Sequence, residues 1–292
     1  MFDFISATMK LTVIETGFFK LDGGAMFGVV PKTIWEKLET PDEKNLCTWA
    51  MRCLLVQSAD RNILIDCGLG NKQSDKFFSY YEPHGDFNLL SSLEKAGLKA
   101  DDITDVFLTH LHFDHVGGAV SIVDGNYLPA FPNATYWSNQ DHWHWAMNPN
   151  SREKASFLKE NFEPLMHAGV LKFIDAATFD SQTNFCENFD VIFAYGHTEA
   201  MMLPCLTVNN KKIIYCADLL PSPSHIPLPY VMGYDVRPLQ TMIEKEYFLK
   251  RAVSEQWILV FEHAKSVEAC TVKTDEKGRV VVDKSAKLSD FI

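Results

Sequence analysis

The fold of this chain is decided by the stretch His110-Leu111-His112-Phe113-Asp114-His115, which comes just after the apolar run Val106–Leu108. Imidazole and carboxylate side chains are the ligands that Zn²⁺ and similar divalent cations prefer. Crowded together without a metal, these groups would have to be solvated or paired, at a cost in free energy. The pattern HxHxDH is also far more specific than HxH alone. It predicts a metal site in a tight loop at the end of a strand.

The same arrangement recurs later in the chain, where His197, Asp218 and His263 each come just after an apolar, strand-like run. Strands are expected over Lys10–Thr16, Ala50–Gln57, Asn62–Cys67, Thr104–Thr109, Ala134–Trp137, Val191–Tyr195, Lys212–Cys216 and Trp257–Phe261. Helices are expected over Asn88–Ala96, Ser151–His167 and Leu239–Val253. This alternation predicts an α/β fold with two sheets packed face to face and helices outside. We expect a single domain over residues 1–292, with a short N-terminal extension of about residues 1–9.

The metal-binding side chains are numerous enough for two cations. His110, His112 and His197 form one candidate ligand set, and Asp114, His115 and His263 form the other. Asp218 at a strand end has a carboxylate that can bridge the two cations, together with a water or hydroxide. Because these positions are filled, His142 and His144 are not expected to bind metal.

This order of residues resembles the metallo-β-lactamase superfamily, whose members have an αββα sandwich and usually two zinc ions. The segments that carry the resemblance are Thr109–Gly118, Gly196-His197-Thr198, Ala217-Asp218 and Glu262-His263. The resemblance implies that Asp66, in Asp66-Cys67-Gly68, orients one of the metal ligands from behind. We therefore expect two divalent metal ions, most simply Zn²⁺.

Two further segments are similar to a narrower branch, the YtnP-type lactonases, which open N-acyl-homoserine lactones in quorum quenching. They are Leu21–Trp35 and the region from Ala217-Asp218-Leu219-Leu220 to Val231–Asp235. The resemblance implies a lactonase in which a hydroxide bridging two metals attacks the ester carbonyl. Residues 140–190 match only loosely, and Glu199-Ala200-Met201 departs from the pattern of many relatives, which leaves the substrate contacts of that loop open.

Proton donation to the leaving group is assigned to water, Asp114 or His225, the last of which lies in a proline-rich loop. Candidate pocket residues are Met26, Phe27, Phe113, Trp145 and Tyr230. For Met26 and Phe27, packing in the core is an equally good interpretation. The aromatic segment 137–147 either packs beneath the helix expected at Ser151–His167 or forms an apolar wall for an acyl chain.

Composition limits the partners and the location. The formal net charge is −11 and there is no block of Lys and Arg, which argues against a nucleic-acid partner and favours a neutral, partly apolar small molecule. Seven cysteines without CxxC spacing predict free thiols. The sequence shows no signal peptide and no apolar run of about 18 residues, so we expect a cytoplasmic protein without a membrane span. A homodimer is left open.

Other activities suit the same ligands. A phosphotriesterase of the methyl-parathion-hydrolase type or a thioester hydrolase of the glyoxalase II type would use the same nucleophile, although no basic cluster for glutathione is visible. A metal-binding protein without turnover is the non-enzymatic alternative. Assays on lactones, esters, thioesters and phosphotriesters distinguish these possibilities.

Overall fold

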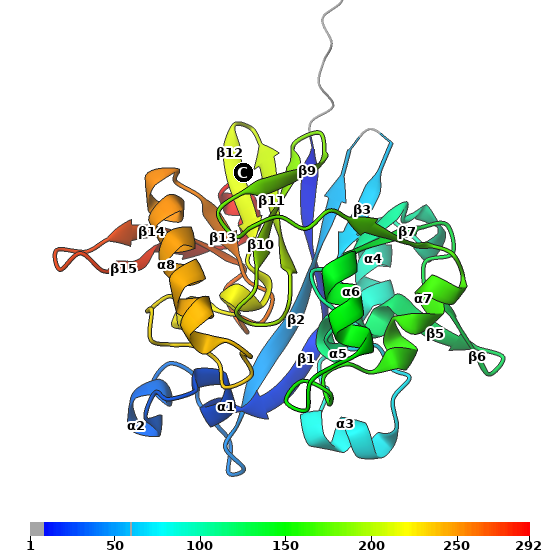
Figure 1. Cartoon of the computed structure of the whole chain (residues 1–292), viewed down its shortest axis with the longest axis horizontal. Coiled ribbons are helices and arrows are strands. Elements are labelled where there is room, and N and C mark those ends of the chain that lie inside the picture. Colours follow the sequence, from blue (N-terminus) through cyan, green and yellow to red (C-terminus); the bar gives the residue numbers. More distant parts are fainter. Residues whose placement is uncertain (1–8, 59) are drawn as a thin grey trace, which may run out of the picture.

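Two mixed β-sheets organise the chain, which the computed structural model describes over residues 9–58 and 60–292 (Figure 1). The six-stranded sheet has the order β1-β2-β3-β4-β7-β8, with β1 Lys10–Asp22, β2 Leu46–Gln57, β3 Asn62–Ile65, β4 Asp105–Phe107, β7 Thr135–Asn139 and β8 Leu171–Ile174. The seven-stranded sheet has the order β15-β14-β13-β12-β11-β10-β9, with β9 Gln182–Cys186, β10 Phe189–Ala194, β11 Met201–Val208, β12 Lys211–Tyr215, β13 Ile258–Val260, β14 Ala269–Thr274 and β15 Val280–Ala286. A separate hairpin pairs β5 Val120–Val123 with β6 Asn126–Pro129.

Helices cover the outer faces of both sheets, which confirms the predicted sandwich (Figure 1). In Figure 1, α8 flanks the seven-stranded sheet, where it packs against β14 and β15, and α4, α6 and α7 lie on the side of the six-stranded sheet. The helices are α1 Gly23–Phe27, α2 Lys32–Trp35, α3 Asp75–Tyr81, α4 Leu89–Lys95, α5 Phe113–Val116, α6 Gln140–Met147, α7 Glu163–His167 and α8 Pro238–Ser254. Within the described residues, none of these helices is long and apolar enough to cross a membrane.

Strand β3 shows why the central strands are apolar without interruption. Ile63 and Ile65 pack into the core cluster that contains the seven-stranded sheet, whereas Leu64 packs into the cluster beneath the helices. Successive side chains of a strand point to opposite faces, so a strand covered on both faces needs apolar residues at every position. The cluster between the sheets draws on side chains from both of them. All seven cysteines are free thiols, as expected.

The prediction of one helix over Ser151–His167 is wrong. Only its last part is α-helical, in α7, and a single 3₁₀ turn covers Lys159–Asn161. Pro164 lies in the first turn of α7, the position that proline tolerates, and it would have broken a helix that ran through it. The apolar residues that suggested one helical face instead anchor separate turns. The helices expected over Asn88–Ala96 and Leu239–Val253 are confirmed as α4 and α8.

The first strand is longer than expected and contains a β-bulge. The register of β1 against β2 shifts between Glu15 and Phe18, where Gly17 has a φ of 120°. Beyond the bulge the strand continues to Asp22, whose side chain accepts a hydrogen bond from the amide of Ala25 at 2.8 Å and so begins α1. The expected extension at residues 1–9 lies outside the described residues except for Met9, which is buried.

Candidate metal centre

The histidine-rich loop after β4 is held in place by Asp66, which follows the neighbouring parallel strand β3. Asp66 accepts hydrogen bonds from the amide of Thr109 at 2.8 Å and from its hydroxyl at 2.6 Å. Its Oδ2 atom also lies 3.1 Å from Nδ1 of His115. Because the ends of parallel neighbours lie side by side, one carboxylate can fix both the loop and a ring within it. This location supports the role that was expected for Asp66.

Two glycines let the end of this loop lie against the loop after β3. A Cβ atom at Gly117 would stand 2.0 Å from the carbonyl oxygen of Leu69, and one at Gly118 would stand 2.2 Å from that of Cys67. Neither approach leaves room for a side chain. Close packing against the loop after β3 therefore explains the two glycines that follow the HxHxDH pattern.

Three histidines from two loops form the first cluster. Nδ1 of His112 lies 3.1 Å from Nε2 of His110 and 3.2 Å from Nε2 of His197, which follows β10. Oδ2 of Asp218, in the turn after β12, lies 3.2 Å from Nε2 of His197. These four residues are all buried and offer one ligand atom each.

Asp114, His115 and His263 form the second cluster. The Nε2 atoms of His115 and His263 are 3.2 Å apart, and Oδ2 of Asp114 is 3.8 Å from each of them. Oδ1 of Asp218 lies 3.0 Å from His263 Nε2 and 3.5 Å from His115 Nε2. The structure thus brings all seven expected ligands together, with the two oxygens of Asp218 directed at different clusters.

A partner behind each histidine fixes which ring nitrogen carries the proton. The nitrogen that faces away from the clusters lies near a hydrogen-bond acceptor in every case: Thr109 Oγ1 for His110, Glu153 for His112, Asp66 and Glu262 for His115, Asp235 for His197, and the carbonyl of Ala50 for His263. Because the outer nitrogen is the donor, the inner nitrogen of each neutral ring presents a lone pair. In the neutral state that cation binding requires, five lone pairs therefore point into the two clusters.

This geometry fits divalent cations. Lone pairs that face each other at 3.1–3.2 Å repel unless a cation lies between them. Two bonds of about 2.0–2.1 Å at a tetrahedral angle place ligand nitrogens about 3.3 Å apart, close to the observed spacing. Oδ1 of Asp218 is buried and makes no hydrogen bond to any described residue. Without a cation, burial opposes charge on His263, yet the Asp218 carboxylate raises its pKa to about 9, so the site favours a positive charge, carried by a proton on this ring or by a bound cation.

The ligands with the greatest remaining exposure are His112, Asp114 and Asp218, at 6–8%. His112 belongs to the first cluster, Asp114 to the second, and Asp218 lies against both.

His225 does not occupy the position that was expected of a proton donor. It is buried, its Nδ1 lies 2.8 Å from the hydroxyl of Ser222, and its Nε2 lies 3.0 Å from the carbonyl oxygen of Met26. Burial lowers its pKa to about 3. With both nitrogens engaged, the ring links the proline-rich loop to α1, and its location supports a structural role.

The predicted pocket residues divide into core and boundary positions. Met26 and Phe27 are almost fully buried, and Phe27 is stacked between His225, at 4.8 Å, and Trp35, at 5.6 Å. Core packing therefore describes this pair, and the interpretation as pocket rim is not supported. Phe113, next to Asp114, is buried between Phe77 and Tyr81 of α3.

The other two pocket candidates are half-buried. Tyr230 meets the edge of Phe27 at 6.2 Å, and Trp145 donates a hydrogen bond to Glu153, the carboxylate behind His112, at 2.7 Å. Trp143, from the same aromatic segment, packs against Phe162 beneath the six-stranded sheet. The segment therefore contributes both to the core and to the support of a ligand.

Sequence reasoning missed several residues that support the centre. Glu153, Asp235 and Glu262 each lie within 3.4 Å of a ligand histidine. His142 accepts a hydrogen bond from the amide of Leu111 at 2.8 Å and so holds the HxHxDH loop without being a ligand. Only Glu262 had a local signal, because it directly precedes His263.

The sequence model described as the metallo-beta-lactamase superfamily matches residues 52–263. No curated protein sequence matches the chain. Among solved structures, a probable metal-dependent hydrolase from Staphylococcus aureus is 26% identical with a TM-score of 0.85, over 97% of this chain and 98% of that chain.

Two further solved structures have the same fold at lower identity. AidC, a dizinc quorum-quenching lactonase solved with a product, is 22% identical with a TM-score of 0.77, over 97% of this chain and 96% of its own. A mutant of AiiA from B. thuringiensis with N-decanoyl-L-homoserine at its active site is 17% identical with a TM-score of 0.66, over 89% of this chain and 95% of its own.

Proposed function

The chain belongs to the metallo-beta-lactamase superfamily, and we propose that it is a metal-dependent hydrolase that opens lactone esters, N-acyl-homoserine lactones in particular. The observation that carries the proposal is the placement of Asp218, whose two oxygens face two separate clusters of ligand atoms at 3.2 and 3.0 Å. Such an arrangement is suited to two adjacent cations and not to one structural ion.

The two segments that are similar to YtnP-type lactonases support the choice of substrate because they contact each other beside the centre. The amide of Gly233 donates to the carbonyl of Ala25 at 2.7 Å, and a Cβ atom at Gly28 would stand 2.4 Å from the carbonyl oxygen of Val231. His225 joins the same two segments. The resemblance therefore concerns one packed unit next to Asp218. Of the structures with this fold, AidC is a quorum-quenching lactonase and AiiA holds N-decanoyl-L-homoserine at its active site.

The seven ligand residues would hold two divalent cations, most simply Zn²⁺. Bound there, the cations would polarise an ester carbonyl and lower the pKa of a water toward neutrality. Asp218 would hold the two clusters at a fixed separation, because each of its oxygens faces one of them. Asp114, among the more exposed ligands, would hold the proton that the ring oxygen needs when the acyl C–O bond breaks. Water supplies the new carboxyl oxygen, and the product acid releases one proton.

The substrate that suits this site is a neutral, partly apolar small molecule. The chain carries a net charge of −11, which disfavours strongly anionic substrates. On the side of Asp114, the half-buried rings of Phe77 and Tyr81 cover the buried Phe113 and form an aromatic surface. An acyl chain would lie against such a surface.

The deciding experiment measures proton release from short-chain and long-chain N-acyl-homoserine lactones by protein whose Zn²⁺ content has been quantified. We expect chelator-sensitive turnover that reaches its maximum near two cations per chain, and none with Asp218→Asn. Maximal turnover at one cation per chain would contradict the two-cation centre. Full occupancy without lactone turnover, but with turnover of a phosphotriester or a thioester, would assign one of those activities instead.

A further inference from the structure

One face of α8 carries three polar side chains that are almost completely buried. Thr241, Glu244 and Lys245 are 1–2% exposed and lie three and four residues apart, so they project from the same side of the helix. Buried polar groups require partners, because each unpaired group costs free energy. The partners of Thr241 and Glu244 lead directly to the metal centre.

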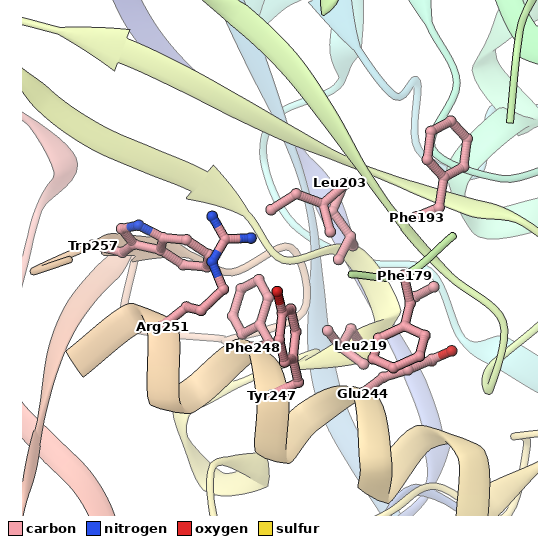
Figure 2. A pocket seen from close by; sticks show the side chains of 11 residues that line it. Phe179, Phe193, Leu203, Leu219, Glu244, Tyr247, Phe248, Arg251 and Trp257 are labelled. Atoms are coloured by element: carbon pink, nitrogen blue, oxygen red, sulfur yellow. The ribbon is translucent and has the colours of Figure 1, made fainter. Parts of the chain in front are cut away.

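Glu244 binds the backbone that immediately precedes His197. Its carboxylate accepts hydrogen bonds from the amide of Tyr195 at 2.8 Å, from the amide of Gly196 at 3.0 Å and from the side chain of Gln240 at 2.9 Å. The other residues around it are mostly apolar. With Phe193, Leu219 and Phe248 it lines a cavity of about 10 Å³, and Figure 2 shows the Glu244 side chain on α8 near Leu219. Such a volume holds no more than one water molecule.

Thr241 reaches the imidazole of His197 through one intermediate residue. Its hydroxyl donates to Oδ2 of Asp235 at 2.8 Å, and Oδ1 of Asp235 lies 2.8 Å from Nδ1 of His197. The loop also rests directly on the helix, since a Cβ atom at Gly196 would stand 2.3 Å from the hydroxyl oxygen of Thr241. The helix therefore positions both the backbone and the imidazole ring of His197.

The segment before α8 completes the attachment. The amide of Arg237 donates to the carbonyl of Gly196 at 2.9 Å, and that of Val236 donates to the carbonyl of His197 at 3.2 Å. The Arg237 side chain donates to the carbonyl of Tyr195 at 2.7 Å. Every backbone carbonyl from Tyr195 to His197 is thus held by residues 236–237.

We propose that the first turns of α8 set the cation affinity of the cluster formed by His110, His112 and His197, with Glu244 as the positioning residue. The inference rests on the proposed metal centre. His110 and His112 come from one loop and are fixed relative to each other by the chain, whereas His197 arrives from the other sheet. Its position depends on the loop 195–197, and Glu244 supplies the acceptor for two amides of that loop.

The test compares Glu244→Gln with Glu246→Gln, which changes the same side chain on the exposed side of α8, where Glu246 pairs with Lys250. A glutamine keeps the shape of Glu244 but presents an NH₂ group to one of the amide donors, so the loop should shift. Cation affinities are measured by competition with a chromophoric chelator. Co²⁺-loaded protein is examined by visible absorption, which reports on the geometry of the ligands.

We expect Glu244→Gln to weaken binding of one of the two cations by about 10- to 100-fold, the range typical of groups behind metal ligands. The affinity for the other cation should remain unchanged, the Co²⁺ spectrum should change, and Glu246→Gln should match the parent. Parent-like affinity and spectrum in Glu244→Gln would overturn the proposal, even with a lowered melting temperature, because a merely structural glutamate would affect stability alone.

If Glu244→Gln fails to fold, Thr241→Val takes its place, since it removes only the hydroxyl that holds Asp235 and should weaken the same cation. An unchanged affinity there would overturn the proposal. No substrate enters these measurements, so a failure of lactone turnover contradicts the proposed function and leaves this inference intact. Absence of cation binding by the parent protein would overturn both.

Discussion

Oδ1 of Asp218 lies 3.0 Å from Nε2 of His263 and still makes no hydrogen bond to any described residue. The ring uses its other nitrogen to contact the carbonyl of Ala50 at 2.7 Å. When the ring is neutral, an acceptor therefore faces a lone pair inside a buried site, a combination that a divalent cation resolves. This relationship and its counterpart at His197 make Asp218 the residue on which both clusters depend.

Asp218→Asn is expected to lower cation content and turnover together. The amide removes one negative charge and offers only one oxygen, so it cannot serve both clusters. Metal analysis after dialysis and the proton-release assay measure the two effects. Asp283→Asn is the matched control, because Asp283 is exposed and pairs with Lys273 on β14. Full cation content in Asp218→Asn would contradict a bridging role.

His225→Leu is expected to destabilise the protein while leaving the cations bound. The substitution leaves the hydroxyl of Ser222 and the carbonyl of Met26 without their buried partner, which costs about 1–3 kcal/mol. His144→Leu, at an exposed position on α6, is the control. Denaturant unfolding and metal analysis are the measurements. Loss of turnover without loss of stability would instead indicate that His225 takes part in the reaction.

The stability that depends on His225 should also vary with pH. Burial lowers its pKa to about 3 from an ordinary value of 6.5. Between these values the unfolded chain binds a proton that the folded chain does not, so the free energy of unfolding falls as the pH falls, by at most about 1.4 kcal/mol per pH unit. The difference between the parent and His225→Leu should shrink from pH 6.5 to pH 4. A constant difference would mean that the buried ring is already charged.

Lys245 should produce a pH dependence at higher pH. Its ammonium donates to the carbonyls of Tyr230, at 2.8 Å, and Pro227, at 3.1 Å, and burial lowers its pKa to about 7. Between pH 7 and the ordinary value of 10.5, the unfolded chain holds the extra proton, so the contribution of Lys245 to stability rises with pH. Urea unfolding of Lys245→Met should show a smaller rise from pH 7 to pH 9 than the parent. Lys250→Met, exposed on the same helix, should behave as the parent does.

Gly118→Ala is expected to disrupt the loop that carries the ligands. Its Cβ atom would stand 2.2 Å from the carbonyl oxygen of Cys67, so the backbone must move, at a cost of about 1–3 kcal/mol. Gly125→Ala, in the open β5–β6 turn with a φ of 79°, should cost only about 1 kcal/mol of backbone strain. Thermal unfolding and cation content of both variants test whether Gly118→Ala is the more damaging substitution. Equal melting temperatures for Gly118→Ala and Gly125→Ala would show that the loop after β3 can move away from the added methyl group.

Much of the fold and of the ligand set could be predicted because the signals are local. Strands covered on both faces are uninterrupted apolar runs, and each ligand comes just after such a run, as His263 does after Ile258–Val260. The helix expected at Ser151–His167 failed because apolar spacing alone does not reveal that Phe157 packs beside His112, at 4.8 Å, while Phe162 packs against Trp143.

The sequence by itself determined the family, the apolar strands that lead into the ligands and the seven side chains able to hold cations, since each depends on a residue and its immediate neighbours. Only the tertiary structure decided that His225 is a buried link, that Phe27 is stacked in the core, and that Asp235 and Glu244 fix His197. These partners come from distant elements. Their pairing is set by the requirement that every buried polar group find an acceptor or donor in the packed interior, a condition that no spacing along the chain records.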